Sequence, residues 1–248
     1  MIVPMLTLFL GVDLRYAIGA SLVSVIATSS GAAAAYVREG FTNIRIGMFL
    51  EIATTAGALV GAYLASYVPT RALAVLFGVV LLYSAWRSIE AREELATAAS
   101  PHPLAVKLRL NGHHPVDGLM RPYAVQGVPA GFGLMFGAGV LSALLGIGSG
   151  AVKVLAMDHQ MRLPFKVSTT TSNFMIGVTA AASAGVYLRR GYIDPGLAMP
   201  VMLGVLGGAM LGARILKRAA VRPLRFAFGG VVVVLAIEMF YKAAQGRL

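Results

Sequence analysis

The chain has 248 residues, of which 58% are hydrophobic and only 12% are charged, and its mean hydropathy is +0.78. A soluble domain carries about twice this charged fraction, so the composition excludes an ordinary water-soluble protein. The net charge of +11 does not indicate nucleic-acid binding, because Lys and Arg cluster at the ends of apolar segments, where they would contact lipid headgroups. Because the sequence has no cysteine, it has neither disulfides nor thiolate metal sites.

Continuous apolar runs follow one another along the chain, and several approach the length of about 20 residues that spans a bilayer. The predicted spans are 16–37, 47–68, 71–89, 129–147, 167–188, 195–216 and 222–243. A transmembrane β-barrel would instead show alternating segments of about ten residues. The predicted fold class is therefore an all-α polytopic membrane protein.

The two halves of the chain match each other without gaps at an offset of 172 − 21 = 151 residues. The matched pairs include Ser21 with Ser172, Thr28 with Thr179, Arg38 with Arg189, Gly57 with Gly208 and Gly61 with Gly212. Such an internal duplication is typical of transporters built from two structural repeats, here of about four transmembrane segments each. The predicted units are a first repeat, 1–89, a polar linker, 90–128, and a second repeat, 129–248.

The segment 129–147 leads into a glycine-rich break, and subtracting 151 places its counterpart before Met1. The first repeat is therefore N-terminally truncated by comparison, either because the first helix lost its first part or because the native start lies upstream, and we expect the latter. Counts of Lys and Arg favour inverted over parallel repeats without deciding between them. In the linker, which we expect on the membrane surface, His113 and His114 are interpreted as a solvated turn rather than half of a metal site, since no further ligand cluster lies at metal-binding spacing.

The break itself, Gly146-Ile147-Gly148-Ser149-Gly150, predicts a pore or a binding site. Each glycine costs a helix about 1 kcal/mol relative to Ala. Backbone groups released in lipid cost several kcal/mol more unless protein or a polar cavity receives them. By contrast, the Gly57/Gly61 and Gly204/Gly208/Gly212 spacings are typical of helix-packing faces.

The helix expected after Pro164 begins with a first turn of hydroxyl and amide side chains, which suits an anion because a helix N-terminus is partially positive. Arg15 and Ser21 occupy the matching places of the first repeat. The predicted substrate-binding residues are Gly146, Gly148, Gly150, Lys166, Ser168, Thr171, Ser172, Asn173, Arg15 and Ser21. The alternative is that the hydroxyls bond to backbone and hold helices together, while the cations extend to headgroups.

These motifs resemble a known family. The glycine stretch, Leu163-Pro164 and the run from Ser168 to Asn173 are similar to the second-repeat signature of the TauE/SafE sulfite exporter family of anion permeases. Val3-Pro4 and Ala17 to Leu22 are similar to that family's first-repeat motif. The resemblance implies a multi-pass transporter of sulfite, sulfonates or related sulfur oxyanions in the cytoplasmic membrane. The chain departs from the family in lacking the first glycine motif and in having Ser149 where Gly is frequent.

Glu51 lies inside an apolar run, where an ionisable group costs about 2.5–3.5 kcal/mol, so we expect it either to carry a coupling proton or to lie near the headgroups after Arg45. We find no activated nucleophile and no Walker motif, and we expect no enzymatic activity, catalytic residue, metal or cofactor. The expected partners are a small-molecule anion and the lipid bilayer, not nucleic acid. An anion channel and a non-transport membrane assembly factor remain the alternative functions.

Overall fold

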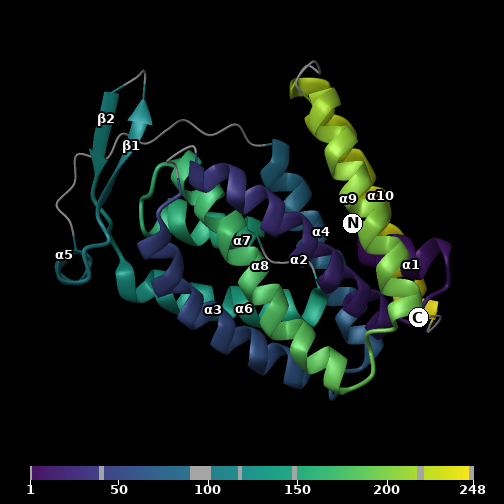
Figure 1. Cartoon of the computed structure of the whole chain (residues 1–248). Helices are drawn as coiled ribbons and strands as arrows, with labels where there is room; N and C mark the ends of the chain where they lie inside the picture. Colours follow the sequence, from purple (N-terminus) through teal and green to yellow (C-terminus); the bar gives the residue numbers. More distant parts are fainter. Residues whose placement is uncertain are drawn as a thin grey trace.

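The computed structural model describes residues 2–38, 42–89, 102–116, 119–146, 150–216 and 221–245. Helices make up nearly all of this part of the chain, as predicted (Figure 1). Before the hairpin the helices are α1 (Ile2–Phe9), α2 (Leu14–Arg38), α3 (Ile44–Leu64), α4 (Thr70–Ile89) and α5 (Pro103–Lys107). After it come α6 (Val128–Leu145), α7 (Gly150–Leu155), the π-helical turn η1 (Ala156–Gln160), α8 (Phe165–Arg189), α9 (Pro195–Leu216) and α10 (Val221–Gln245).

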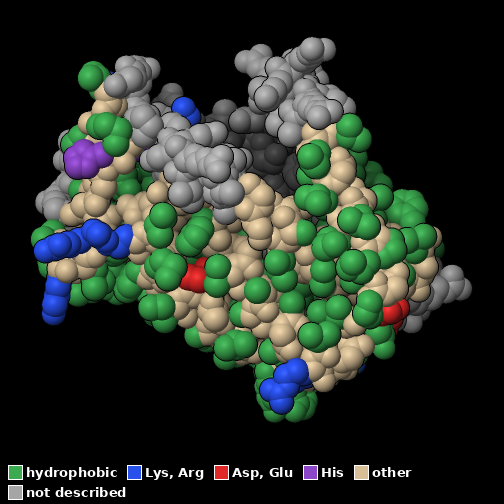
Figure 2. All heavy atoms as spheres, viewed as in Figure 1, with side chains coloured by type: hydrophobic (Ala, Val, Ile, Leu, Met, Phe, Trp, Pro, Cys, Tyr) green, Lys and Arg blue, Asp and Glu red, His purple; other side chains and the backbone are tan. Residues whose placement is uncertain are grey.

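Each predicted apolar span overlaps one long helix. Among the described residues, α3 and α6 are long and apolar enough to cross a membrane, and Thr70–Tyr83 and Pro195–Leu211 are shorter apolar helical stretches. Apolar side chains cover much of the face seen in Figure 2, whereas most Lys and Arg side chains visible there lie toward its edges. This distribution suits a helical body surrounded by lipid.

The long helices recur at the sequence offset. α2 and α8 each have 25 residues, and both of their ends differ by 151 (165 − 14 and 189 − 38). The first residues of α3 and α9, and of α4 and α10, also differ by 151 (195 − 44 and 221 − 70). The part of α7 and η1 from Lys153 onward corresponds at this offset to α1.

The helices α2 and α8 pack against each other in opposite directions. Near the start of α2, a Cβ atom at Gly19 would overlap the carbonyl oxygen of Tyr192, just beyond the end of α8. Ser29 lies further along α2, and its Oγ would be 2.7 Å from a Cβ atom placed at Gly177 in the middle of α8. Residue numbers therefore rise along α2 as they fall along α8, so the two helices are antiparallel.

Glycine allows α3 and α6 to approach closely. Cβ atoms at Gly57 and Gly61 would overlap the carbonyl oxygens of Phe136 and Val140, which leaves no room for any other side chain. The predicted packing face of α3 is thus confirmed. On α9, no atom comes within 4 Å of a Cβ placed at Gly204 or Gly208, so these glycines do not form the predicted packing face with described residues. The surroundings of Gly212 lie outside the described part.

The linker contains α5 and an antiparallel hairpin of β1 (Gly112–Val116) and β2 (Leu119–Tyr123), which projects from one side of the helices (Figure 1). His113 pairs with Pro122, and His114 pairs with Arg121. The prediction that the two histidines form a turn was therefore wrong. The pairing of β1 with β2 holds them in an extended strand instead.

Asn43 attaches this hairpin to the start of α3. Its side-chain oxygen accepts a hydrogen bond from Ile46 N at 3.0 Å and caps the helix, while its Nδ2 donates to Tyr123 Oη at 2.6 Å and Leu110 O at 3.2 Å. Burial raises the pKa of Tyr123, and the hydrogen bond from Asn43 opposes that rise. The tyrosine is thus a neutral acceptor that fixes the linker to the helical body.

Candidate functional site

The predicted glycine break interrupts the chain between α6 and α7. α6 ends at Leu145, and Gly146 follows with φ +64°, a left-handed conformation that favours glycine. A Cβ at Gly146 would also lie 2.9 Å from Ile18 Cγ2 on α2. Helix resumes at Gly150, while Ile147, Gly148 and Ser149 lie outside the described residues.

Two predicted serines meet at this break. Ser21 Oγ on α2 donates to the Gly146 carbonyl at 2.7 Å, and Ser172 Oγ on α8 donates to the Gly150 carbonyl at 3.2 Å. Both serines are buried, and they occupy equivalent positions at the offset of 172 − 21 = 151. The structure thus brings four predicted site residues together, and the serine hydroxyls donate to a backbone carbonyl on each side of the break.

The remaining predicted residues of α8 have different surroundings. Thr171 Oγ1 accepts a hydrogen bond from Asn43 N at 3.1 Å, at the junction with the linker. Ser168 is fully buried, and its hydroxyl has no hydrogen-bond partner among the described residues. Asn173 is partly buried, whereas Lys166 is exposed at the start of the helix.

Arg15 and Lys166, the two predicted cations, lie at opposite ends of α8. Arg15 donates to Ser66 O and to Tyr192 Oη, each at 3.3 Å, next to the ends of α3 and α8. Lys166 is in the first turn of α8, and a helix of this length spans about 37 Å. The antiparallel packing of α2 and α8 therefore separates these two cations, so they do not line one cradle.

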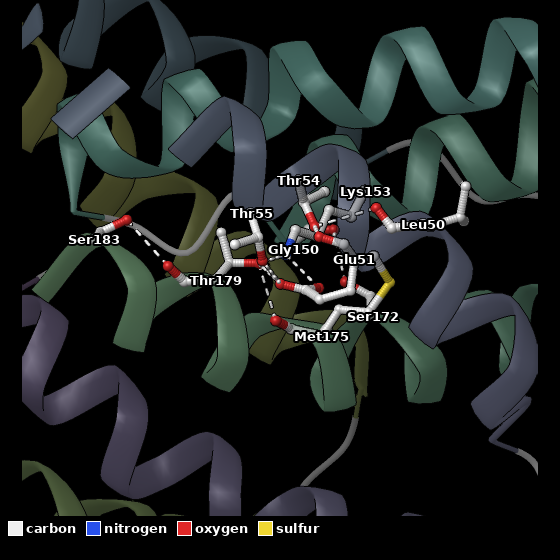
Figure 3. A network of polar contacts seen from close by, with 10 residues as sticks. All are labelled: Leu50, Glu51, Thr54, Thr55, Gly150, Lys153, Ser172, Met175, Thr179 and Ser183. Carbon is white, nitrogen blue, oxygen red and sulfur yellow. Dashed lines mark hydrogen bonds and ion pairs between the residues drawn. The ribbon is translucent and has the colours of Figure 1, made fainter. Parts of the chain in front are cut away.

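A third cation, Lys153 of α7, lies one turn after Gly150, in a polar network with residues of α3 and α8 (Figure 3). Its side chain is 0% exposed. Its Nζ donates to Thr179 Oγ1 on α8 at 2.5 Å and lies 3.9 Å from Glu51 Oε2 on α3. Three helices thus meet around one buried ion pair.

Glu51 is 6% exposed and packed inside the protein. Its Oε1 accepts hydrogen bonds from Thr179 Oγ1 at 2.7 Å and Thr55 Oγ1 at 3.0 Å. Its Oε2, which faces Lys153, has no hydrogen-bond partner among the described residues. Leaving either charge of a buried pair alone would cost several kcal/mol, so each group requires the other or a substitute of the same charge.

Sequence reasoning selected Glu51 but missed Lys153. At the 151-residue offset, Arg15 and Lys166 match each other, and both were therefore selected. Lys153 aligns with Ile2 (153 − 151 = 2), and Glu51 aligns with Met202 (51 + 151 = 202). A lone lysine in an apolar stretch directly after a helix break was the available signal, because ionisable groups in such segments are expensive.

Comparison with known proteins identifies the family. A model of the sulfite exporter TauE/SafE family matches residues 1–239. The chain belongs to this family. It is 25% identical over 235 residues to the Bacillus subtilis (strain 168) "Probable membrane transporter protein YunE", covering 95% of this chain and 84% of that protein. It is 26% identical over 214 residues to "Probable membrane transporter protein YdhB" of the same strain, covering 86% and 79%.

A "Probable membrane transporter protein" of Xylella fastidiosa (strain 9a5c) is 25% identical over 243 residues, covering 97% of this chain and 85% of that protein. No solved structure gave a significant match. As a TauE/SafE family member, the protein is a membrane transporter, in agreement with the family that the sequence motifs indicated.

Proposed function

We propose that this TauE/SafE protein is a multi-pass secondary transporter that carries a small anion across the cytoplasmic membrane. Its substrate class is the sulfur oxyanions and organosulfonates, such as sulfite. The observation that carries the proposal is the complete burial of Lys153 one turn beyond a broken helix. An ammonium group inside a membrane protein needs an anion beside it. Glu51 supplies that anion in the structure, and a substrate anion could take its place because a lysine offers three donors on a flexible stem.

The surrounding backbone supports a site that is formed before the substrate arrives. Ser21 and Ser172 donate to the Gly146 and Gly150 carbonyls, so the residues on both sides of the break are held by α2 and α8 without a ligand. The same segment leads directly into the helix that carries Lys153. An oxyanion at this position would accept hydrogen bonds from Nζ, and the sequence-predicted residues Gly150 and Ser172 belong to the same junction.

The helix order supports alternating access by two inverted repeats. Helices equivalent at the 151-residue offset, α2 and α8, run antiparallel, as an inverted-topology pair requires. The ion pair joins α3 of the first predicted repeat to α7 of the second. Rocking of one repeat against the other would therefore act directly on the groups that hold the anion.

The proposal is tested by flux of a panel of oxyanions and organosulfonates into proteoliposomes. We expect saturable uptake and counterflow, which an anion channel does not show. The double variant Glu51→Gln/Lys153→Met removes both charges without leaving one buried alone, so it should fold and elute as the parent does while its flux falls to background. Lys107→Ala, a change at an exposed linker lysine, is the matched control and should transport like the parent. Parental flux in the double variant would overturn the site, and absence of flux for every anion with the parent would overturn the function.

A further inference from the structure

We infer that Glu51 is the internal counter-ion of Lys153 and binds the proton that accompanies each transported anion. This inference rests on the proposed function and adds its energetic coupling. In the structure, the Glu51 carboxylate neutralises Lys153. When an anion takes that place beside the ammonium group, Glu51 becomes protonated, and it returns the proton when the anion leaves.

Among the described residues, Glu51 and Lys153 form an ion pair whose other neighbours are uncharged. Lys153 of α7 is the charged group that faces it, and α3 itself contributes the hydroxyls of Thr54 and Thr55 nearby. α6, which packs on α3, has no titratable side chain from Val128 to Leu145. On α8 the contact comes from Thr179, whereas the titratable groups Lys166, Tyr187 and Arg189 lie toward the ends of that helix.

Charge balance then requires a proton. The pair without substrate is neutral: one ammonium and one carboxylate. Adding a monovalent anion X⁻ alone would leave a net negative charge in a site whose two side chains are 0% and 7% exposed, which is costly because the site is shielded from solvent. With the proton, –NH₃⁺ and –COO⁻ plus X⁻ and H⁺ become –NH₃⁺, X⁻ and –COOH, and the site is neutral again.

The geometry lets a bound anion replace Glu51 beside Lys153. The Nζ–Oε2 distance of 3.9 Å is too long for a hydrogen bond, so separating these atoms breaks no direct hydrogen bond between them, and the incoming anion replaces the electrostatic attraction that is lost. Oε2 has no hydrogen-bond donor among the described residues, so no described hydrogen bond must be broken when this oxygen accepts a proton. As a carboxylic acid it becomes a donor, and the bound oxyanion supplies an acceptor on the side that Lys153 occupies.

Thr179 can serve both protonation states. Its Oγ1 accepts from Lys153 Nζ and lies within donating distance of two acceptors, Glu51 Oε1 at 2.7 Å and Met175 O at 3.0 Å. Because the hydroxyl has one proton, it donates to one acceptor at a time. It can donate to the carboxylate when Glu51 is charged and turn to the Met175 carbonyl when Glu51 is protonated, without moving its oxygen.

The test uses the protein in liposomes with methanesulfonate, a permanently ionised monovalent anion that cannot itself carry the proton. The membrane potential is held at zero by potassium and valinomycin. An inwardly directed proton gradient should then raise the methanesulfonate concentration inside the vesicles at least fivefold above the concentration outside. A pH dye inside the vesicles should report one proton per sulfonate. This measurement needs no variant. Sulfonate uptake with no proton movement would overturn the inference and leave the proposed function standing.

Glu51→Gln gives the second arm, because Gln imitates the protonated carboxyl and cannot release the proton. We expect counterflow of methanesulfonate to persist, whereas net proton-driven uptake falls more than tenfold, since the empty site would carry an uncompensated ammonium charge. Glu238→Gln, at an exposed carboxyl on α10, is the matched control and should retain both activities. Proton-coupled uptake by Glu51→Gln at the parental rate would overturn the inference. Absence of counterflow for every anion with the parent would instead overturn the proposed function.

Discussion

Two serine hydroxyls hold the carbonyl groups on either side of the glycine break. Ser21 and Ser172 occupy the same place in the two halves of the sequence, yet they reach opposite ends of one irregular segment. The sequence predicted both positions and the break. It could not predict that the hydroxyls bind backbone, because a serine in an apolar helix can either bind a ligand or satisfy a neighbouring carbonyl, and both roles leave the same pattern.

Removing Ser21 should therefore cost stability. Ser21→Ala leaves the Gly146 carbonyl unpaired in a buried position, and we expect a loss of about 1 kcal/mol, within the range measured for hydrogen bonds between membrane helices. The melting temperature in detergent should fall by roughly 2–4 °C. Thr169→Ala is the control, because among the described residues Thr169 donates to Phe165 O within its own helix turn. Equal melting temperatures for both variants would contradict the prediction.

The repeat pattern in the sequence does not indicate Lys153 as a site residue, for a physical reason. Matching the two halves of the sequence finds residue types that both halves share. Lys153 and Glu51 instead align with apolar residues at the 151-residue offset, Ile2 and Met202. Their pairing depends on the contact of α3 with α7 and α8, which are distant in sequence. Only tertiary structure shows that these two ionisable side chains neutralise each other.

At the scale of whole elements, apolar length and the offset located the long helices to within a few residues. They did not locate the hairpin. His113 is preceded by Gly112 and followed closely by Pro115, and both glycine and proline are unfavourable in strands, so local propensity indicated a turn. The strand forms because it pairs with β2, and β2 is held through Tyr123 and Asn43.

Gly57 of α3 and Gly208 of α9 align at the 151-residue offset and give a matched pair of substitutions, because among the described residues only Gly57 of the two lies in a close helix contact. At Gly57 a methyl group would overlap Phe136 O, so Gly57→Ala should separate the two helices, lower the melting temperature by at least 5 °C and broaden the elution profile in detergent. At the equivalent Gly208, where nothing lies within 4 Å, Gly208→Ala should be neutral or raise helix stability by up to about 1 kcal/mol. Tolerance of Gly57→Ala, or a severe defect from Gly208→Ala, would show that these helix faces are assigned incorrectly.

For the molecule as a whole, the sequence left the relative direction of the two halves open. Charge counts depend on whether the segment between Gly146 and Lys166 crosses the membrane, and its length did not settle that. The structure shows a short helix and a π-helical turn there, with α2 and α8 antiparallel beyond it. Long-range packing therefore gives the relative direction of α2 and α8, which composition could not give.

A cross-link between α2 and α8 tests whether these helices move in transport. A Cβ at Gly177 would lie 3.6 Å from Ser29 Cβ, within the range for a disulfide, and the natural chain has no cysteine to interfere. We expect Ser29→Cys/Gly177→Cys to lose at least 80% of its flux on oxidation and to recover it after reduction. The single variant Ser29→Cys should respond to neither reagent. Full flux in the oxidised, cross-linked protein would place the moving interface elsewhere.

Among the described residues, the Lys153–Glu51 pair occurs once, and its two members have apolar counterparts at the 151-residue offset. If one pair handles one anion and one proton in each turnover, as we propose, a monovalent substrate crosses without electrical current. The membrane voltage, which would otherwise expel an anion with about 2.3 kcal/mol per 100 mV, then has no influence on the direction of movement. The proton gradient and the concentration gradient of the anion alone would then decide whether the anion is taken up or exported.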